Sequence, residues 1–190
     1  MRTGSNIQKA AFEKRIAELQ EQLGIPEDYQ AQHKLRPREE CTQLISIGQD
    51  IFGRDQQMAP RAAQAWFDMK EAAASSGIEL QAVSAFRSID YQAGIIRRKL
   101  DAGLSMENIL EVSAAPGFSE HHTGRALDIT TPGFEPLEEV FEDSPAFKWL
   151  QKSAVKFGFK MSFPRNNPHG VAYEPWHWCW DQHVSRSITV

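Results

Sequence analysis

The chain of 190 residues is long enough to bury one full hydrophobic core and too short for two complete domains. Apolar residues make up 41% of it and charged residues 24%, as in ordinary globular proteins, and the formal net charge is −4. This acidic balance argues against a nucleic-acid binder, and no apolar run reaches the roughly 20 residues that span a bilayer. The first residues lack the apolar segment of a secretory signal, so the sequence predicts a cytoplasmic protein.

The first predicted element is a helix over residues 7–23, where apolar side chains recur at helical spacing up to Gly24. A polar, proline-rich connector follows, and we expect a short helix over 39–52. Residues 1–57 are therefore predicted to form a helical extension with its connector, and residues 58–183 the main domain. The first helix either packs on that domain or mediates dimerisation, and packing is the favoured interpretation. The sequence does not determine the oligomeric state.

The rest of the chain alternates between helical and extended patterns. A proline at the first turn and a glycine at the end mark the helices that start near Pro60 and Pro145. Helices are predicted over 59–77, 88–100, 106–112 and 145–158, and strands over 78–86, 125–130, 159–163 and 172–180. This pattern predicts an α+β fold with a small, mostly antiparallel sheet flanked by helices and preceded by the helical extension.

The segment SEHHTGRALDIT, residues 119–130, places two adjacent histidines shortly before an aspartate. A catalytic zinc ion takes three protein ligands of the His, Asp, Glu or Cys type and keeps a fourth position for water. His121 or His122, together with Asp128 and His177, form such a set. Spacing neither chooses between the adjacent histidines nor excludes His169, His183 or Cys179, and a cysteine ligand favours a closed structural site. Gly124 is expected to allow a sharp turn after the histidines.

Glu174 lies three residues before His177, so a regular strand would point the two side chains to opposite faces. Pro175 between them argues against a regular paired strand, and we expect a kink that turns both side chains inward. Alternation sends Trp176 and Trp178 to the face opposite His177, and we expect their rigid apolar rings to wall the site. A tryptophan-rich segment by itself is nevertheless more typical of core packing.

Three separated motifs resemble one family of zinc peptidases. SEHHTGRALD matches the pattern Ser-x-His-x-x-Gly-x-Ala-x-Asp, and EPWHW the pattern Glu-x-x-His, of the VanY-type D-alanyl-D-alanine carboxypeptidases. These are grouped with lysostaphin and the hedgehog signalling domain. Upstream, VSAFRSIDYQ resembles the strand and Arg-Ser segment of the same family. The likeness covers roughly residues 58–180, with the motifs in the family's order.

The resemblance implies a role for each matching residue. It implies zinc ligands at His121, Asp128 and His177, a general base at Glu174, and contacts to the C-terminal residue of the substrate from Arg87, Gln92 and Ser119. Phe163 departs from the family, in which a tyrosine is frequent at this place, so the turnover and specificity of this chain are left open.

The activity that the resemblance implies is a zinc-dependent carboxypeptidase that removes a C-terminal D-alanine from peptidoglycan stem peptides. The motifs do not distinguish a D,D bond from an L,D bond. One alternative is a lysin-type endopeptidase that cuts the cross-linked cell wall, and another is a non-catalytic, zinc-containing module that binds wall peptides. Glu174 argues against the module, because a site that only binds needs no general base.

Overall fold

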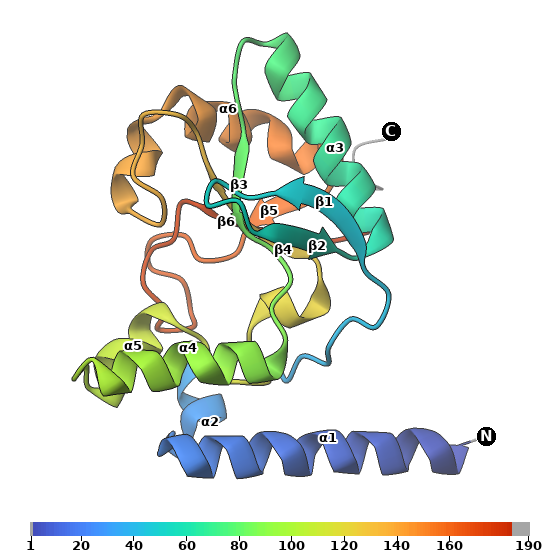
Figure 1. The fold of residues 1–190 in the computed structure, drawn as a ribbon, viewed down its shortest axis with the longest axis vertical. Helices are drawn as coiled ribbons and strands as arrows, with labels where there is room; N and C mark the ends of the chain where they lie inside the picture. The colour runs from blue at the N-terminus through green and yellow to red at the C-terminus, as the bar shows by residue number, and fades with distance from the viewer. Residues whose placement is uncertain (1, 184–190) are drawn as a thin grey trace.

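The computed structural model describes residues 2–183, with side chains described from residue 9 onward. Helices α1 (Arg2–Leu23), α4 (Ile89–Asp101) and α5 (Met106–Val112) lie along one side of the molecule, and the strands with helices α3 (Pro60–Ser75) and α6 (Pro145–Ser153) lie on the other (Figure 1). None of the described helices combines the length and the apolar character needed to cross a bilayer.

The central sheet contains four strands in the order β3–β4–β6–β5, and every neighbouring pair is antiparallel. The strands are β3 (Gln81–Ser84), β4 (Ala126–Thr130), β6 (His177–Trp180) and β5 (Phe159–Met161). Asp128 in β4 pairs with His177 in β6 and with Ser84 in β3. The expected α+β class, with a small antiparallel sheet flanked by helices, is confirmed.

The main hydrophobic core lies between the central sheet and helices α3 and α6. Leu127 and Ile129 in β4 point into it, as their alternation with Ala126 and Asp128 predicts. Trp178 packs edge-on against Phe147 of α6, with 6.4 Å between the ring centroids, and Trp176 packs against the same cluster. The expectation that these tryptophans wall the functional site is therefore wrong. Trp178 does lie on the face of β6 opposite His177, as predicted. The large apolar rings are more favourable in the core than at the pocket.

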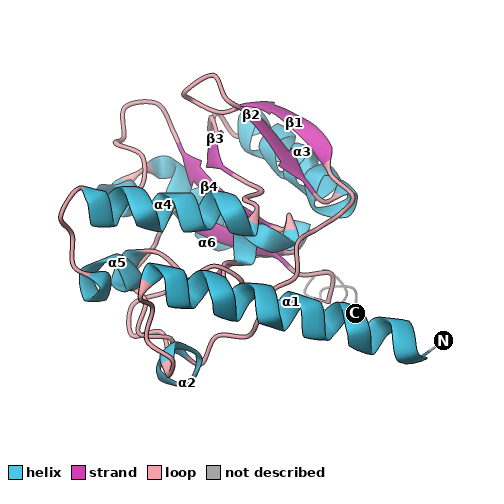
Figure 2. Ribbon diagram, turned by 60° about the horizontal axis from the view of Figure 1, so that its bottom comes forward, coloured by secondary structure: helices cyan, strands magenta, loops and turns pink. Residues whose placement is uncertain are grey.

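A second core holds the N-terminal helices against the rest of the chain. Ile16 of α1 and Tyr29 of α2 (Tyr29–His33) are buried in one cluster with Ile96 of α4 and Ile109 of α5. Helix α1 runs alongside α4 in both ribbon views (Figure 2). The Ala115 N–H donates a 3.0 Å hydrogen bond to the buried Tyr29 hydroxyl. The N-terminal helix thus packs on the main domain, as favoured from the sequence.

The predicted helix over 39–52 is wrong, because residues 45–49 of this segment form the first strand of a β-hairpin. Strands β1 (Ile45–Gln49) and β2 (Asp55–Met58) pair antiparallel. Gly48 and Gly53 have φ values of +90° and +74°, which a right-handed helix does not accommodate. The alternation of isoleucine with small polar residues in β1 also has the period of a strand.

The last elements are shorter than their sequence patterns. β6 begins at His177 and not at residue 172, because Pro175 has no N–H to donate to a ladder. β5 ends at Met161, two residues before the predicted end. The helix predicted over 145–158 is α6 followed by a 3-10 turn, η3 (Ala154–Phe157), and a further 3-10 turn, η2 (Glu139–Asp143), precedes it.

The turn of the hairpin is organised by the buried carboxylate of Asp50. It accepts hydrogen bonds of 2.7 to 3.0 Å from the backbone of Phe52 and Arg54 and from the side chains of Arg54 and Gln56. Gln56 in turn accepts from the Ala85 N–H at 2.9 Å, just beyond β3. Burial alone would raise the pKa of Asp50, but these donated hydrogen bonds lower it below its usual value.

Replacing Asp50 with Asn is expected to lower the free energy of unfolding by about 1–3 kcal/mol, since the buried donors lose a charged acceptor. Denaturant unfolding followed by tryptophan fluorescence measures this. A carboxylate whose folded pKa is lowered stabilises above its unfolded pKa of about 4 and loses that contribution as the pH falls through the folded value. The difference from wild type should therefore shrink in acid. Asp55→Asn, on the exposed part of the same hairpin, is the control and should behave as wild type.

Candidate metal centre and surrounding pocket

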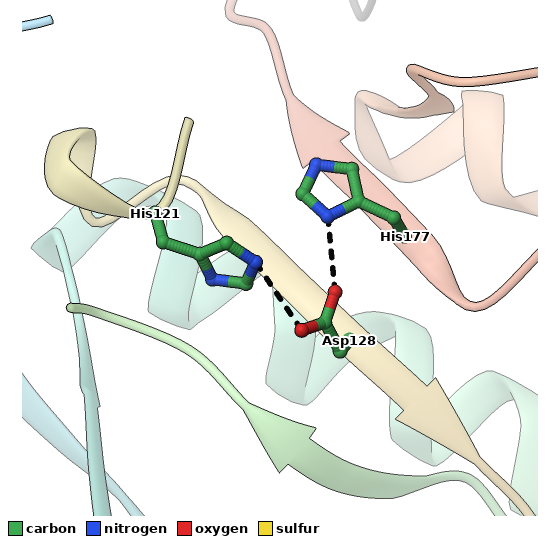
Figure 3. Close-up of side chains that lie close together, drawn as sticks. All are labelled: His121, Asp128 and His177. Carbon is green, nitrogen blue, oxygen red and sulfur yellow. Dashed lines mark hydrogen bonds and ion pairs between the residues drawn. The ribbon is translucent and has the colours of Figure 1, made fainter. Parts of the chain in front are cut away.

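Three buried side chains from three elements converge at the end of the β4–β6 pair. Their candidate ligand atoms all lie within 4.8 Å of one another. Asp128 and His177 face each other across the two strands, and His121 comes from the 3-10 turn η1 (Glu120–Thr123) that leads into β4 (Figure 3). Gly124 ends this turn at φ +63°, where a Cβ would meet the Ala59 nitrogen at 2.9 Å. The expected sharp turn at this glycine is confirmed.

Of the two imidazole nitrogens of His121, one forms a hydrogen bond and the other forms none within the described part of the chain. Its Nδ1–H donates to the Ala85 carbonyl oxygen, which can only accept, so this partner determines the tautomer. Nε2 lies 3.3 Å from Asp128 Oδ2 and has no hydrogen-bond partner in the described part of the chain. Burial lowers the pKa of His121 to about 4, which keeps the ring neutral. A buried, neutral nitrogen with a free lone pair suits a metal ion.

The adjacent His122 is engaged by the backbone at both of its nitrogens. Nδ1 donates to the Arg87 carbonyl oxygen at 2.7 Å, and Nε2 accepts from the Gly117 N–H at 3.1 Å. The side chain is fully buried, and burial lowers its pKa to about 4. Geometry therefore separates two histidines that spacing alone could not. His121 faces Asp128, whereas His122 hydrogen-bonds to the backbone of Arg87 and Gly117.

His177 lies between two carboxylates. Its Nδ1 is 2.9 Å from Asp128 Oδ1 and its Nε2 is 3.1 Å from Glu120 Oε2. Burial by itself lowers the pKa of His177, but the bonds to Asp128 and Glu120 raise it to about 10. Burial would raise the pKa of Asp128, yet the two histidines hold it well below its usual range. The pocket thus stabilises a positive charge next to Asp128, in the place where a cation would be held.

The other candidate ligands lie outside this cluster. His169 and His33 each direct Nδ1 to the other's carbonyl oxygen, at 3.0 and 2.9 Å. Cys179 is buried, and burial raises the pKa of its thiol, so it stays protonated. Neither Cys179 nor Cys41 forms a disulfide. His183 follows β6, and its N–H donates to Asp181 Oδ1 at 3.0 Å.

Glu174 shares the pocket with His177, 3.9 Å from its Nδ1. The His177 N–H donates to the Glu174 carbonyl oxygen at 3.1 Å, which closes a turn over Pro175 and Trp176. This turn brings both side chains inward, and the expected kink at Pro175 is confirmed. Burial raises the pKa of Glu174 to about 7, against the attraction of His177. A carboxyl group poised near neutrality beside a metal site is suited to exchange protons.

The pocket is a small cavity of about 40 Å³. Arg87, Gln92 and Ser119 line it together with Glu174, His121 and His177. Arg87 Nη1 donates to Gln92 Oε1 at 3.3 Å, and Gln92 Nε2 donates to the Ala114 carbonyl oxygen at 2.8 Å. Gln92 therefore orients Arg87, whose Nε is buried without a hydrogen-bond partner among the described residues. The Ser119 hydroxyl accepts from the His121 N–H at 3.3 Å.

Sequence reasoning missed the part played by Glu120. Its side chain is only 14% exposed, and it contacts His177, Ser162 and Arg38 at 3.1, 2.5 and 3.3 Å. Burial alone would raise the pKa of Glu120, but the bond to His177 and the other contacts hold it well below its usual range. The only signal in the sequence was its place inside the motif, between Ser119 and His121. Its partners lie far away in the chain.

Comparison with known proteins agrees with this geometry. Residues 55–183 match the model of the family described as VanY, D-alanyl-D-alanine carboxypeptidase. YodJ of Bacillus subtilis (strain 168) is 34% identical over 166 residues, which cover 85% of this chain and 58% of YodJ. A D-alanyl-D-alanine carboxypeptidase of Enterococcus faecium is 28% identical over 123 residues, covering 63% of this chain and 36% of that protein. The chain thus spans just over half of the length of YodJ and about a third of the length of the Enterococcus faecium protein.

A solved structure shows the same fold. The LdcB LD-carboxypeptidase is 33% identical and superposes with a TM-score of 0.69, over 80% of this chain and 74% of LdcB. The family model covers more than half of the chain and includes all seven predicted site residues. The chain belongs to the VanY family of D-alanyl-D-alanine carboxypeptidases.

Proposed function

We propose that the protein is a zinc-dependent carboxypeptidase that removes a C-terminal D-alanine from peptidoglycan stem peptides. The observation that carries this proposal is the single buried pocket in which His121, Asp128 and His177 converge beside Glu174 and Arg87. Two imidazoles and one carboxylate are the donor set of an open, catalytic zinc site. We further propose that residues 58–183 carry the catalytic machinery and that residues 1–57, with the N-terminal helices, the connector and most of the hairpin, support it.

The ion would be held by His121 Nε2, an oxygen of Asp128 and His177 Nδ1. When bound, zinc supplies a Lewis acid that polarises the scissile carbonyl and activates water. Glu174 then takes a proton from the attacking water and returns it to the leaving amine, in its two successive roles of general base and general acid. Burial suits the Glu174 carboxyl to this exchange, because its pKa of about 7 allows it to accept and release a proton near neutrality.

Arg87 would bind the terminal carboxylate of the substrate. A guanidinium can donate two parallel hydrogen bonds to a carboxylate. The buried Nε of Arg87, which has no partner among the residues that the structure describes, is one such donor. Gln92 keeps the guanidinium in place, and Ser119 lies on the same wall. A carboxylate-binding arginine in the same pocket as the candidate metal ligands places the C-terminus of the substrate next to the scissile bond. This favours an exopeptidase over a lysin-type endopeptidase.

The relatives support the substrate class. LdcB is named as an LD-carboxypeptidase whose structure concerns peptidoglycan recognition, and the Enterococcus faecium relative is named as a D-alanyl-D-alanine carboxypeptidase. Both names describe a carboxypeptidase that removes a C-terminal D-amino acid. They differ in the bond that is cut, so the choice between D,D and L,D is left to the assay.

Purified, zinc-loaded protein is expected to release D-alanine from a muropeptide that ends in one D-alanine or from one that ends in two. Both should be assayed side by side, with release followed by chromatography. Release from the tetrapeptide alone assigns the L,D bond, and release of one D-alanine from the pentapeptide alone assigns the D,D bond. No release from either, by protein with one zinc bound per chain, would contradict the proposed function.

Replacing Glu174 with Gln should lower kcat by about 100- to 10,000-fold, the usual contribution of a positioned general base. Zinc content should stay at one per chain, because Glu174 is not one of the converging ligands. Glu71→Gln, on the exposed face of α3, makes the same chemical change away from the pocket and should leave kcat unchanged. A Glu174→Gln protein with near wild-type kcat would remove Glu174 from the mechanism.

Zinc binding should release about one proton at neutral pH. The pKa of His177 is about 10 in the metal-free protein, so the ion must displace its proton. The apparent affinity for zinc is accordingly expected to rise with pH until His177 is deprotonated without metal. Calorimetric titration in two buffers of different ionisation enthalpy counts the protons. A binding heat that is the same in both buffers would mean that zinc does not displace the proton of His177.

A further inference from the structure

The carboxylate of Glu120 lies between the candidate metal centre and the N-terminal connector. Its Oε2 is 3.1 Å from His177 Nε2 and accepts from the Ser162 hydroxyl at 2.5 Å. Its Oε1 accepts from Arg38 Nη2 at 3.3 Å. Arg38 precedes the region that matches the family model. Glu120 therefore connects the imidazole of His177 to a part of the chain outside the family's shared domain.

The two nitrogens of His177 have different neighbours. Nδ1 is 2.9 Å from Asp128 Oδ1, on the side of the other ligand residues, and Nε2 faces Glu120. Both neighbours are carboxylate oxygens, which can only accept, so each nitrogen carries a proton while no ion is bound. Only Nδ1 lies beside the other ligand residues, so an ion that binds there replaces the Nδ1 proton and leaves the Nε2–H on Glu120. The lone pair of a neutral His177 is then on Nδ1. In metal sites, a carboxylate on the second imidazole nitrogen orients the ring and raises its basicity.

We propose that Glu120 is a positioning residue for the zinc ion, and that Arg38 acts through it. Glu120 holds the Nε2–H form of His177 and so directs the Nδ1 lone pair toward the ion. Arg38 holds the carboxylate of Glu120 in place. This inference rests on the proposed function only in taking the bound ion to be zinc.

The connector itself is anchored by its backbone and by a neighbouring side chain. The Arg38 N–H donates to the Gly117 carbonyl oxygen at 2.7 Å, and the Cys41 N–H to the His122 carbonyl oxygen at 2.8 Å. The Glu40 carboxylate accepts from the Ile89 N–H. None of these contacts uses the guanidinium of Arg38. Removing that guanidinium should therefore change the contact to Glu120 while the connector stays attached.

A purely structural role for Glu120 gives a different expectation. A buried carboxylate needs a partner, and Arg38 with Glu120 could simply be an ion pair that stabilises the fold. Loss of the pair would then lower the free energy of unfolding and leave the affinity for zinc unchanged. The affinity for zinc is thus the measurement that separates positioning from structural support.

The decisive experiment compares zinc dissociation constants of the full chain by competition with a chromogenic chelator at one neutral pH. Glu120→Gln should weaken zinc binding by about 10- to 100-fold, the usual effect of losing such an outer carboxylate. Arg38→Ala should weaken it by a smaller factor. Arg36→Ala is the matched control, because it removes the same charge from an exposed side chain of the same connector and should bind as wild type.

The double variant Arg38→Ala with Glu120→Gln tests whether the two residues act as one unit. If Arg38 acts only through Glu120, the double variant should bind zinc as weakly as Glu120→Gln alone. Ser162→Ala removes one donor to the same carboxylate and provides a milder change should Glu120→Gln unfold. It too should weaken zinc binding.

A wild-type zinc affinity in both Glu120→Gln and Ser162→Ala would overturn the proposal and make Glu120 a structural partner of Arg38. Equal losses in Arg36→Ala and Arg38→Ala would overturn the part assigned to Arg38, since net charge alone would explain them. These measurements need no substrate. A wild-type protein that binds zinc but releases no D-alanine would therefore refute the proposed function and leave this inference standing.

Discussion

The register between β4 and β6 is the constraint on which the site depends. It places Asp128 directly opposite His177, so two side chains separated by 49 positions in the chain meet at 2.9 Å. A shift of one residue would turn Asp128 into the core and Leu127 into the pocket. The buried alternation of β4 excludes that shift, because Leu127 and Ile129 are needed between the sheet and the helices.

The imidazoles of His121 and His177 are each oriented by a different kind of hydrogen-bond acceptor. His121 donates to the backbone at Ala85, whose own N–H is held by Gln56 and through it by Asp50 of the hairpin turn. His177 faces the carboxylate of Glu120, which is held from the connector. Both supports begin in the first 57 residues, so the N-terminal part of the chain contacts the surroundings of the site at two places. Burial then strengthens the contacts of the two imidazoles, since His121 and His177 are almost fully shielded from water.

Much of the fold and the identity of the site residues could be predicted from the sequence. The helix at 59–77 has a proline at its first turn and a glycine at its end, and the motif around Asp128 contains two of the three side chains that converge. The hairpin was missed although its signals are local, since Asp50 accepts from Phe52 and Arg54 within the turn and β1 alternates as a strand does. Only the contact of Gln56 with Ala85 joins it to a distant part of the chain. For the tryptophans beside His177 the sequence predicted the face, but not that they would pack in the core and leave the site unwalled. Their burial partner, Phe147, belongs to another helix.

The sequence by itself determined which chemistry the chain can hold: a His-Asp-His donor set, a nearby acid and an arginine, in segments of recognisable local structure. The family resemblance already implied His121 over His122, but only the tertiary structure gave the physical reason. The backbone at Arg87 and Gly117 occupies both nitrogens of His122, and the backbone at Ala85 only one of His121. The tertiary structure also decided that Glu120 belongs to the surroundings of the metal site. Ligand direction is set by hydrogen bonds between elements far apart in the chain, and no local pattern encodes them.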